Sequence, residues 1–389
     1  MCSHLSRSRA ALLLQVAQLY WEEGLAQEEI ASRLGYSRPT VSRMLAQARR
    51  AGIVTVTVSH PIQRLMALEK ALVQAYGLTE ARVSEAGPPG TEEVRGFEHG
   101  AREGSGPGGI SAAVARSAGE LLLEYSGPRS VIAVSNGRAV GAVVHHLPER
   151  TWPHSTAVAM LGATGDSLQL EDGPDICRSL ALRLGGHYRS LPVPLVFDSL
   201  RSAQAVREED QVLTTLELAG RSDVALTGIG SVGESTSPLL RRWMTLGVSQ
   251  ECRDRGVVAH LCGHHLNASG QHVGTSLCDR TVCLDPERLR DIPMVIGVAA
   301  GRSKIGAIRA ALAGGYLSGL ATDEPTARAL IAAAERDRAR GSGKDRVGSR
   351  GQGEGGSRGG IPEARRRRRG QEAQDGARRR SPARRTGRG

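Results

Sequence analysis

Four short segments of the chain place polar or charged side chains directly after an apolar run, and three of them also contain glycine. They are Ser135-Asn136-Gly137-Arg138, Thr227-Gly228-Ile229-Gly230-Ser231, Ala300-Gly301-Arg302-Ser303-Lys304 and Thr322-Asp323-Glu324. Backbone N–H groups at a helix start and a lysine can bind a phosphate, and an aspartate can accept hydrogen bonds from sugar hydroxyls. Each segment alone is typical of ordinary loops, so the prediction of a sugar or sugar-phosphate site depends on their convergence. We expect eight residues to frame it: Ser135, Asn136, Gly137, Arg138, Gly228, Gly230, Lys304 and Asp323.

The same part of the chain also contains groups suited to acid–base catalysis. Isomerisation of a sugar phosphate needs a general base and a proton donor close to the ligand. The candidates are Asp166, His260, Asp323 and Glu324, but no paired acid–base motif stands out. We therefore expect no catalytic residue and no enzyme. A sugar-phosphate isomerase or deaminase with an accessory helix-turn-helix is the alternative.

Cysteine and histidine cluster late in the chain, at Cys262, His264, His265, His272, Cys278 and Cys283. Their spacing matches no closed zinc site, and the chain has no Cys-X-X-Cys pair. We expect no metal, and no cofactor other than a sugar effector. No secretion signal and no apolar stretch of about 20 residues is present, which favours reduced thiols, a cytoplasmic, nucleoid-associated protein and no membrane partner.

A second group of polar residues suits contact with DNA. Its members are Ser37, Arg38, Thr40, Ser42, Arg43, Gln47 and Arg50. Arginine can bind guanine edges through two hydrogen bonds, and serine, threonine and glutamine can bind bases or phosphates. When the apolar stripe Val41, Leu45 and Ala48 faces inward, these side chains point outward. We therefore expect double-stranded operator DNA as a partner.

The elements that must position these side chains are two short helices on either side of a turn at Gly35. Ile30 and Leu34 lie on one face of the first helix, and an earlier amphipathic segment around Leu13 supplies a supporting helix. Ala26 lacks the usual capping side chain, which we expect to cost about 1 kcal/mol. The alternating residues 54–58 predict a short strand that closes the unit. A helical hairpin with a solvated basic face is the alternative.

Apolar runs that alternate with helical segments begin near Ile110. Strands are expected at 130–135, 157–161, 224–228, 256–260, 294–298 and 319–322. Continuous apolar strands separated by helices predict a parallel sheet that is covered on both faces. Ligands of such sheets bind beyond the carboxyl ends of the strands, which is where the four polar segments lie. The predicted fold is a multidomain α/β protein, with an N-terminal helix-turn-helix and a Rossmann-like sheet domain.

Charge is distributed unevenly along the 389 residues. The formal net charge is +11, but residues 341–389 hold 14 Arg and 1 Lys against 3 Glu and 2 Asp, which is +10. This Arg- and Gly-rich segment lacks large apolar residues and is expected to be disordered, either as a nonspecific binder of nucleic acid or as a solvated tail without a role. We expect a DNA-binding domain at 8–60, a linker helix and hinge at 61–109, an effector domain at 110–338 and the tail at 339–389.

Several motifs in a fixed order resemble the SorC family of sugar-binding bacterial transcriptional regulators. They are the segment 24–45, Gly52-Ile-Val, Leu226-Thr-Gly-Ile-Gly230, residues 300–308 and Ala321-Thr-Asp-Glu-Pro-Thr-Ala327. The likeness covers about residues 10–337. It implies a helix-turn-helix joined to a sugar-phosphate-isomerase-type effector domain that acts as an oligomer. The family's Gly-Asp pair is here Ala259-His260, which removes a carboxylate from the expected ligand region.

The function we expect is a sequence-specific regulator, a repressor by default, whose operator binding is controlled by a sugar or sugar phosphate. A homodimer or homotetramer is needed for two helices to meet successive major grooves. A nonspecific nucleic-acid binder that depends on the arginine tail is the second alternative. Removal of residues 341–389 separates the two hypotheses, because only the regulator keeps sequence-specific binding.

Overall fold

The computed structural model describes residues 6–54, 61–85, 109–165, 172–233 and 243–347. Three helices form an N-terminal unit: α1 (Arg7–Trp21), α2 (Gln27–Leu34) and α3 (Arg38–Arg50). Side chains from all three helices meet in one core, which includes Leu13, Ile30 and Val41. The predicted helix-turn-helix and its supporting helix are therefore confirmed. The strand expected at 54–58 lies largely outside the described residues.

Local hydrogen bonds explain how the two short helices begin and end. Gly35 ends α2 with a φ of 69°, a left-handed conformation that glycine adopts without strain. Ala26 provides no side-chain cap, as expected. Instead, the Glu29 carboxylate accepts a hydrogen bond from the Ala26 N–H at 2.7 Å. At the start of α3, the hydroxyls of Ser37 and Thr40 are hydrogen-bonded at 2.8 Å.

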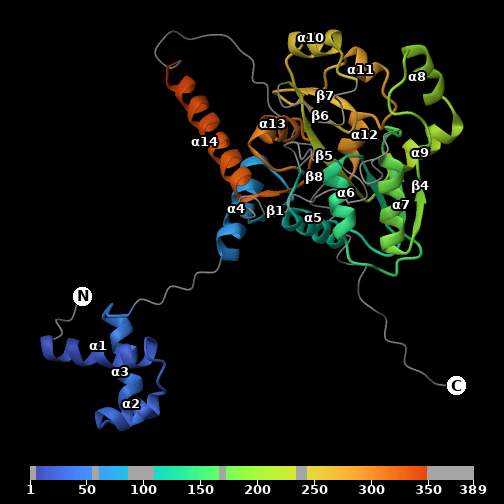
Figure 1. Cartoon of the computed structure of the whole chain (residues 1–389). Helices are drawn as coiled ribbons and strands as arrows, with labels where there is room; N and C mark the ends of the chain where they lie inside the picture. Colours follow the sequence, from blue (N-terminus) through green and yellow to red (C-terminus); the bar gives the residue numbers. More distant parts are fainter. Residues whose placement is uncertain (1–5, 55–60, 86–108, 166–171, 234–242, 348–389) are drawn as a thin grey trace, which may run out of the picture. The chain divides into compact units, whose positions relative to one another are not determined.

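A mainly parallel sheet organises the second domain (Figure 1). Its parallel strands lie in the order β1 (Glu80–Ser84), β9 (Gly319–Asp323), β8 (Met294–Val298), β5 (Val224–Ser231), β2 (Val131–Val134), β3 (Thr156–Ala159) and β4 (His187–Arg189). Five of these strands were predicted at nearly the same positions. Alternate residues face opposite layers: Ile132 and Val134 belong to one core and Ala133 to the other.

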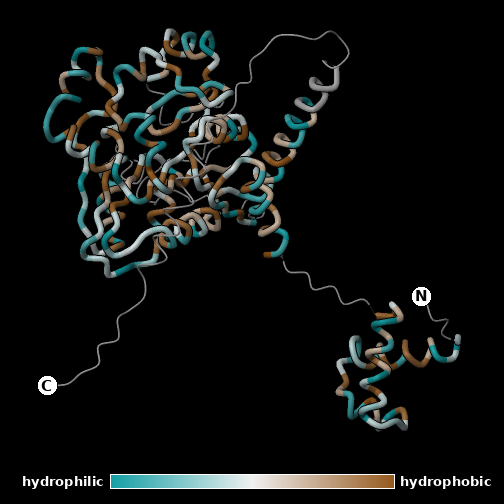
Figure 2. The backbone as a smooth tube through the Cα atoms, turned by 180° about the vertical axis from the view of Figure 1, so that it is seen from behind, coloured by the Kyte–Doolittle hydropathy of each residue, from teal (hydrophilic) through white to brown (hydrophobic). Residues whose placement is uncertain are grey.

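Helices cover both faces of the sheet. One core receives side chains from α5 (Ala112–Glu124), α6 (Arg138–His146), α7 (Gly173–Leu184) and α8 (Leu200–Arg207). The other receives them from α4 (Pro61–Tyr76), α12 (Pro286–Asp291), α13 (Ile305–Ala313) and α14 (Glu324–Val347), while α9 (Asp210–Gly220) contributes to both. Brown and teal alternate along these helices in Figure 2, as expected for helices with one buried face. The predicted doubly covered parallel sheet is confirmed.

Two expectations about the sheet were incomplete. Residues 256–260 were expected among the parallel strands, but β6 (Val257–Leu261) runs antiparallel to β5 and forms a hairpin with β7 (His264–Asn267). The reason is that β5 continues past its parallel neighbours, and its last residues, Ile229–Ser231, offer an edge only to a returning strand. In addition, β1 pairs with β9, so residues 61–85 belong to the sheet domain, whereas we expected a linker.

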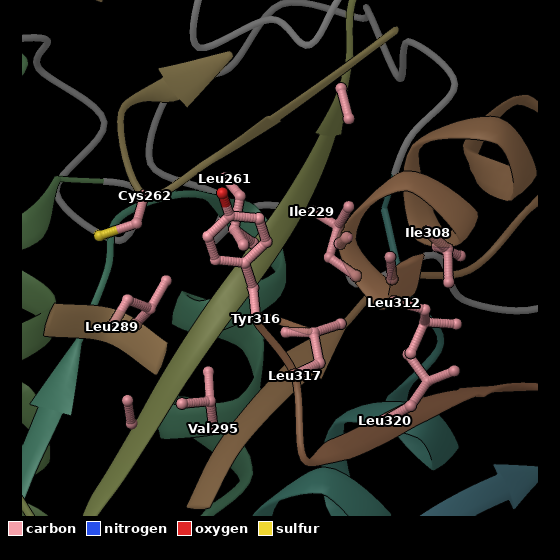
Figure 3. Close-up of a cluster of buried hydrophobic side chains, with 14 of the residues drawn as sticks. Ile229, Leu261, Cys262, Leu289, Val295, Ile308, Leu312, Tyr316, Leu317 and Leu320 are labelled. Atoms are coloured by element: carbon pink, nitrogen blue, oxygen red, sulfur yellow. The ribbon is translucent and has the colours of Figure 1, made fainter. Parts of the chain in front are cut away.

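The hairpin is anchored over a tightly filled part of the core (Figure 3). Tyr316 is 1% exposed, lies among Leu261, Cys262 and Leu289, and has the Arg290 guanidinium 4.2 Å from its ring centroid. Two short helices follow β5 and β7 in the chain: α10 (Leu246–Asp254) and α11 (Ser276–Asp279). The core therefore fixes the hairpin beside the end of β5.

The described chain ends in α14. The tail was expected from residue 339, but the helix continues to Val347, because helix propagation adds one hydrogen bond per residue without a new nucleus. The described residues up to Ala334 and the described residues from Glu335 onward belong to separate units of the chain. The rest of the expected tail, 348–389, lies outside the described residues. None of the described helices is long and apolar enough to cross a membrane.

Candidate functional sites

The strand order reverses at the carboxyl edge of the sheet. From β2 the chain proceeds outward through β3 and β4, and then returns to β5 on the other side of β2 before it continues to β8 and β9. Strands β2 and β5 are therefore adjacent, while their onward connections lead to opposite sides. Doubly wound sheets bind ligands at such a reversal, because the diverging connections leave space above the strand ends.

Residues at the ends of β2 and β5 contact each other across this reversal. Ser135 is 3% exposed, and its hydroxyl accepts a hydrogen bond from the Gly228 N–H at 3.3 Å. Asn136 is 6% exposed, and its Nδ2 is buried without a hydrogen-bond partner in the described structure. An unsatisfied buried amide is uncommon, and a ligand that accepts its hydrogen bond removes the penalty. The structure thus brings Ser135, Asn136 and Gly228 together.

Two tight turns place cations beside these residues. Gly137 precedes α6 with a φ of 108°, and Gly301 precedes the 3-10 helix η2 (Arg302–Lys304) with a φ of 105°. Both values favour glycine, because side chains are strained in that region. The turns leave Arg138 at the first position of α6 and Lys304 at the end of η2, where the positive charge of Arg138 acts on Lys304.

Lys304 is an unusual lysine. It is 8% exposed, and its amine forms no hydrogen bond or salt bridge with any other described residue. Burial, followed by the nearby charge of Arg138, lowers the pKa of Lys304 to about 8. Both causes disfavour the protonated amine, so an anion bound beside Lys304 would relieve an existing electrostatic penalty.

Asp323 forms a hydrogen bond that caps the following helix. Its Oδ1 accepts the Thr326 N–H at 2.9 Å and so caps the start of α14, while the Thr326 hydroxyl accepts the Gly301 N–H at 2.8 Å. These bonds connect the ends of β8 and β9. The Thr322 hydroxyl is fully buried nearby in the sequence and has no partner in the described structure. Asp323 is therefore at the predicted edge, with one oxygen engaged in capping.

Gly230 occupies a different position from the one we expected. It lies opposite His260 in the antiparallel ladder, and the His260 ring fills the space that a Cβ at Gly230 would need. Its lack of a side chain is thus explained by the packing of His260, and a direct ligand contact is not required. A separate cavity of about 340 Å3 lies between α6 and α7, and no predicted effector residue lines it.

The alternative catalytic and metal-binding residues are also placed by the structure. Glu324 forms salt bridges with Arg64 and Arg328 at 3.0 and 2.8 Å, and burial lowers the pKa of His260 to about 3. Asp166 lies outside the described residues. Among the described residues, no group of three or more histidine, cysteine, aspartate or glutamate side chains has an arrangement that could hold a metal ion.

The outer face of α3 is basic. The helix contains four arginines and no acidic residue. Of the predicted DNA contacts, Ser37, Arg38, Ser42, Arg43 and Arg50 are exposed and Thr40 is half-buried. The helix buries Val41, Met44, Leu45 and Ala48, so its opposite side is available to a groove. Met44 was absent from the predicted stripe, although its position fits the helical period.

Contacts with α1 change the assignment of two α3 residues. Gln47 was expected to point outward, but its side-chain oxygen accepts a hydrogen bond at 2.8 Å from Arg9. Arg49 was not among the predicted DNA contacts, and its guanidinium lies 5.2 Å from the Trp21 ring centroid. Tyr36, in the turn before α3, is 40% exposed and is a further candidate for a DNA contact that the sequence analysis missed. Its place next to Ser37 was the available signal.

Comparisons with known proteins identify the two domains that carry these candidate sites. Residues 60–332 match the family model described as "Putative sugar-binding domain", and residues 10–71 match the Crp-like helix-turn-helix domain. The chain is 29% identical over 325 residues to the erythritol catabolism regulatory protein EryD of Brucella abortus, covering 82% of this chain and 96% of that protein. It is 29% identical over 328 residues to the sorbitol operon regulator of Klebsiella pneumoniae, covering 82% and 97%.

The crystal structure of the full-length sorbitol operon regulator SorC from Klebsiella pneumoniae is also similar. The TM-score is 0.62 at 26% identity, with 83% of this chain and 99% of that chain covered. A helix-turn-helix joined to a sugar-binding α/β domain defines a DNA-binding transcriptional regulator that is controlled by a sugar effector. The chain belongs to the SorC family of sugar-binding transcriptional regulators, as its sequence motifs predicted.

Proposed function

We propose that the effector is a phosphorylated sugar whose phosphate binds beside Lys304. The observation that carries this proposal is a largely buried lysine, 8% exposed, that has no anionic partner among the described residues and lies close to the charge of Arg138. A phosphate would balance the positive charge of Lys304 in a region of low dielectric constant. The N–H groups in the first turn of α6 would add donors, since helix starts favour anions.

A polyol skeleton fits the remainder of the site. Asn136 offers an amide donor without a partner, and Asp323 has a second carboxylate oxygen besides the one that caps α14. Such groups suit hydroxyls rather than apolar ligands. The names of two relatives contain erythritol and sorbitol, which are both polyols. We therefore propose a sugar or polyol monophosphate as the effector class.

We propose that binding is followed by no chemical step. Glu324 is held by two arginines, and the ring of His260 is neutral far below physiological pH. A general base or acid works best with a pKa near the operating pH, which His260 does not have, and the Glu324 carboxylate is already engaged by its salt bridges. The effector then acts only through its different affinities for two arrangements of the regulator.

The proposed output is repression by an oligomer. Two α3 helices reach successive major grooves only if at least two chains bind one operator together. The effector, by binding one arrangement more tightly, would shift the population away from the DNA-bound form. Size measurement of the purified chain by light scattering and a reporter gene behind its operator test the oligomeric state and the sign.

Thermal unfolding with ligands tests the phosphate site directly. A ligand at one hundred times its Kd stabilises the native state by about 2.7 kcal/mol. We expect inorganic phosphate and at least one sugar monophosphate to raise the Tm of the full chain, and unphosphorylated sugars to do so far less. Lys304→Met should abolish these shifts. Lys70→Met, at an exposed lysine of α4, should keep them. Equal shifts in both variants would contradict the proposal.

The same substitution carries a second expectation about stability. Lys304→Met removes a buried cation whose pKa is lowered from 10.5 to about 8. Each pKa unit corresponds to about 1.4 kcal/mol, so the variant should gain about 1 to 3 kcal/mol in the free energy of unfolding at pH 7. Lost phosphate binding with increased stability distinguishes a ligand site from a structural lysine.

A further inference from the structure

A buried histidine borders the proposed phosphate site and has no role in the proposal above. His260 is 7% exposed, and its Nδ1 has no hydrogen-bond partner in the described structure. It lies on β6, the strand that pairs with the part of β5 beyond Gly228. Helix α13, which begins directly after Lys304, packs against β6, and the charge of Lys304 acts on the His260 ring. His260 therefore lies on the hairpin side of the proposed phosphate site.

The other two histidines of the hairpin each have at least one structural partner, although the Nδ1 of His264 is also buried without a hydrogen bond in the described structure. His264 donates through Nε2 to the Leu284 carbonyl at 2.7 Å, and His265 shares a hydrogen bond at 2.8 Å between its Nδ1 and the Thr275 hydroxyl. His260 faces His265 across the ladder, yet no hydrogen bond to any described residue satisfies its ring. A buried polar atom without a partner destabilises the native state by about 1 to 3 kcal/mol. This cost disappears if a ligand supplies the missing hydrogen bond.

The surroundings of His260 determine what kind of ligand group fits. Burial and the charges of His265, Lys304 and His264 lower its pKa to about 3, so the imidazole is neutral. A second phosphate or a carboxylate beside the ring would favour protonation of the imidazole, which burial and the neighbouring charges oppose. An ammonium group would add a positive charge beside Lys304. A hydroxyl can donate to or accept from a neutral imidazole without either penalty.

We infer that His260 is a specificity-determining residue for the effector: its Nδ1 binds a sugar hydroxyl and selects ligands with one phosphate and a neutral far end. The inference rests on the proposed phosphate site, because Lys304 sets which end of the ligand carries the charge. Sugar monophosphates are accepted, whereas bisphosphates, phosphorylated sugar acids and amino-sugar phosphates are rejected.

The test measures Kd values for the full chain by calorimetry. The probes are inorganic phosphate and a panel of pentose, hexose and polyol monophosphates, together with the matching bisphosphates, sugar-acid phosphates and amino-sugar phosphates. We expect at least one monophosphate to bind tenfold or more tightly than inorganic phosphate and than its doubly charged counterparts. A panel in which no monophosphate exceeds inorganic phosphate, or in which a bisphosphate binds best, would overturn the inference.

Three variants identify the residue responsible. His260→Leu removes the hydrogen-bonding nitrogen, and we expect it to lose the tenfold advantage while it binds inorganic phosphate as the wild type does. His260→Asn keeps a polar atom near the position of Nδ1 and should retain part of the advantage. His154→Leu, at an exposed histidine, is the control and should bind as the wild type does.

The possible failures are distinguishable. A His260→Leu variant that keeps the full preference for the monophosphate overturns the role of His260 and leaves the phosphate site intact. The proposed function is overturned instead if the wild type does not respond to inorganic phosphate, or if the Lys304→Met variant responds to phosphate as the wild type does. If circular dichroism shows that His260→Leu is unfolded, the comparison of His260→Asn with the wild type decides the question.

Discussion

The two binding regions of this regulator use basic side chains in opposite environments. On α3, Arg38, Arg43 and Arg50 are exposed, and no acidic residue of that helix balances them. In the sheet domain, Lys304 is buried, and its pKa is lowered to about 8. Exposed arginines lose little when DNA is absent, because water solvates them. Burial of Lys304 disfavours its protonated form, and a bound anion offsets this cost. Ligand binding therefore changes the free energy of unfolding of the sheet domain.

This difference in burial allows one chain to separate the recognition of DNA from the sensing of an effector. DNA affinity of exposed cations depends on counterion release and falls with salt concentration. Phosphate binding at a buried site is screened far less by salt. The sensing domain therefore couples ligand binding to its own conformational free energy, while the reading helix can remain unchanged in structure. The following predictions separate the two regions.

The largest effect is expected from a cavity in the core of the helix-turn-helix. Leu13 is fully buried against α2 and α3, so Leu13→Ala should destabilise that unit by about 2 to 5 kcal/mol. Operator binding should be lost in mobility-shift assays, whereas the rise in Tm of the sheet domain with phosphate should persist. Loss of both responses would show that the two regions are not independent.

An exposed arginine should affect DNA binding alone. Arg43 points away from the α3 core, and Arg43→Ala should weaken operator binding by about 1 to 3 kcal/mol if the arginine contacts a base edge. Selection of random DNA by both proteins checks this, and Arg33→Ala, an exposed arginine on α2, is the control. Enrichment of the same sequence with equal strength by wild type and Arg43→Ala would contradict the assigned role of α3.

A pH dependence should be confined to the sensing region. Phosphate beside Lys304 stabilises the ammonium and raises its pKa above the free value of about 8. Above pH 8, binding therefore takes up a proton, and affinity should fall by up to about tenfold per pH unit, which is about 1.4 kcal/mol. Calorimetry of inorganic phosphate from pH 7.5 to 9.5 checks this. A flat profile would exclude Lys304 as the phosphate ligand.

The smallest effect is expected at the start of α2. Glu29→Ala removes the hydrogen bond to the Ala26 N–H and a favourable charge at the positive end of the helix, at a cost of about 0.5 to 1 kcal/mol. The Tm of the helix-turn-helix should fall slightly, with unchanged phosphate binding. Glu28→Ala is the control, because Glu28 places a negative charge in the same first turn but does not accept the Ala26 N–H. Equal losses in both variants would show that the hydrogen bond contributes nothing.

Local patterns were sufficient to predict much of the architecture. The helical period around Ile30 and Val41, with Gly35 between them, defines the helix-turn-helix because those signals act over a few residues. Five strands of the sheet were also predicted from buried apolar runs. The strands β1, β4 and β7 were missed: β4 is three exposed residues, and β7 contains two histidines that only burial in the tertiary structure accounts for.

The candidate sites were predicted less completely. Ser135, Arg138 and Lys304 stay predicted effector contacts: glycine turns follow their strands, and the strand order brings those turns together. Gly230 stays a predicted ligand contact, and the structure adds that its neighbour in the fold is His260. Gln47 stays a predicted DNA contact, and the structure adds that it accepts a hydrogen bond from Arg9 of another helix. Both additions come from contacts between segments that are far apart in the sequence.

The sequence by itself determined the class of protein, the reading helix and the residue types at the strand ends, because periodicity, turn chemistry and motif order are local properties. Tertiary structure decided which of those residues meet, which direction β6 takes, and how deeply Lys304 and His260 are buried. Burial and the proximity of charges depend on distant parts of the chain. They alone make Lys304 a strained cation and His260 a neutral group without a partner.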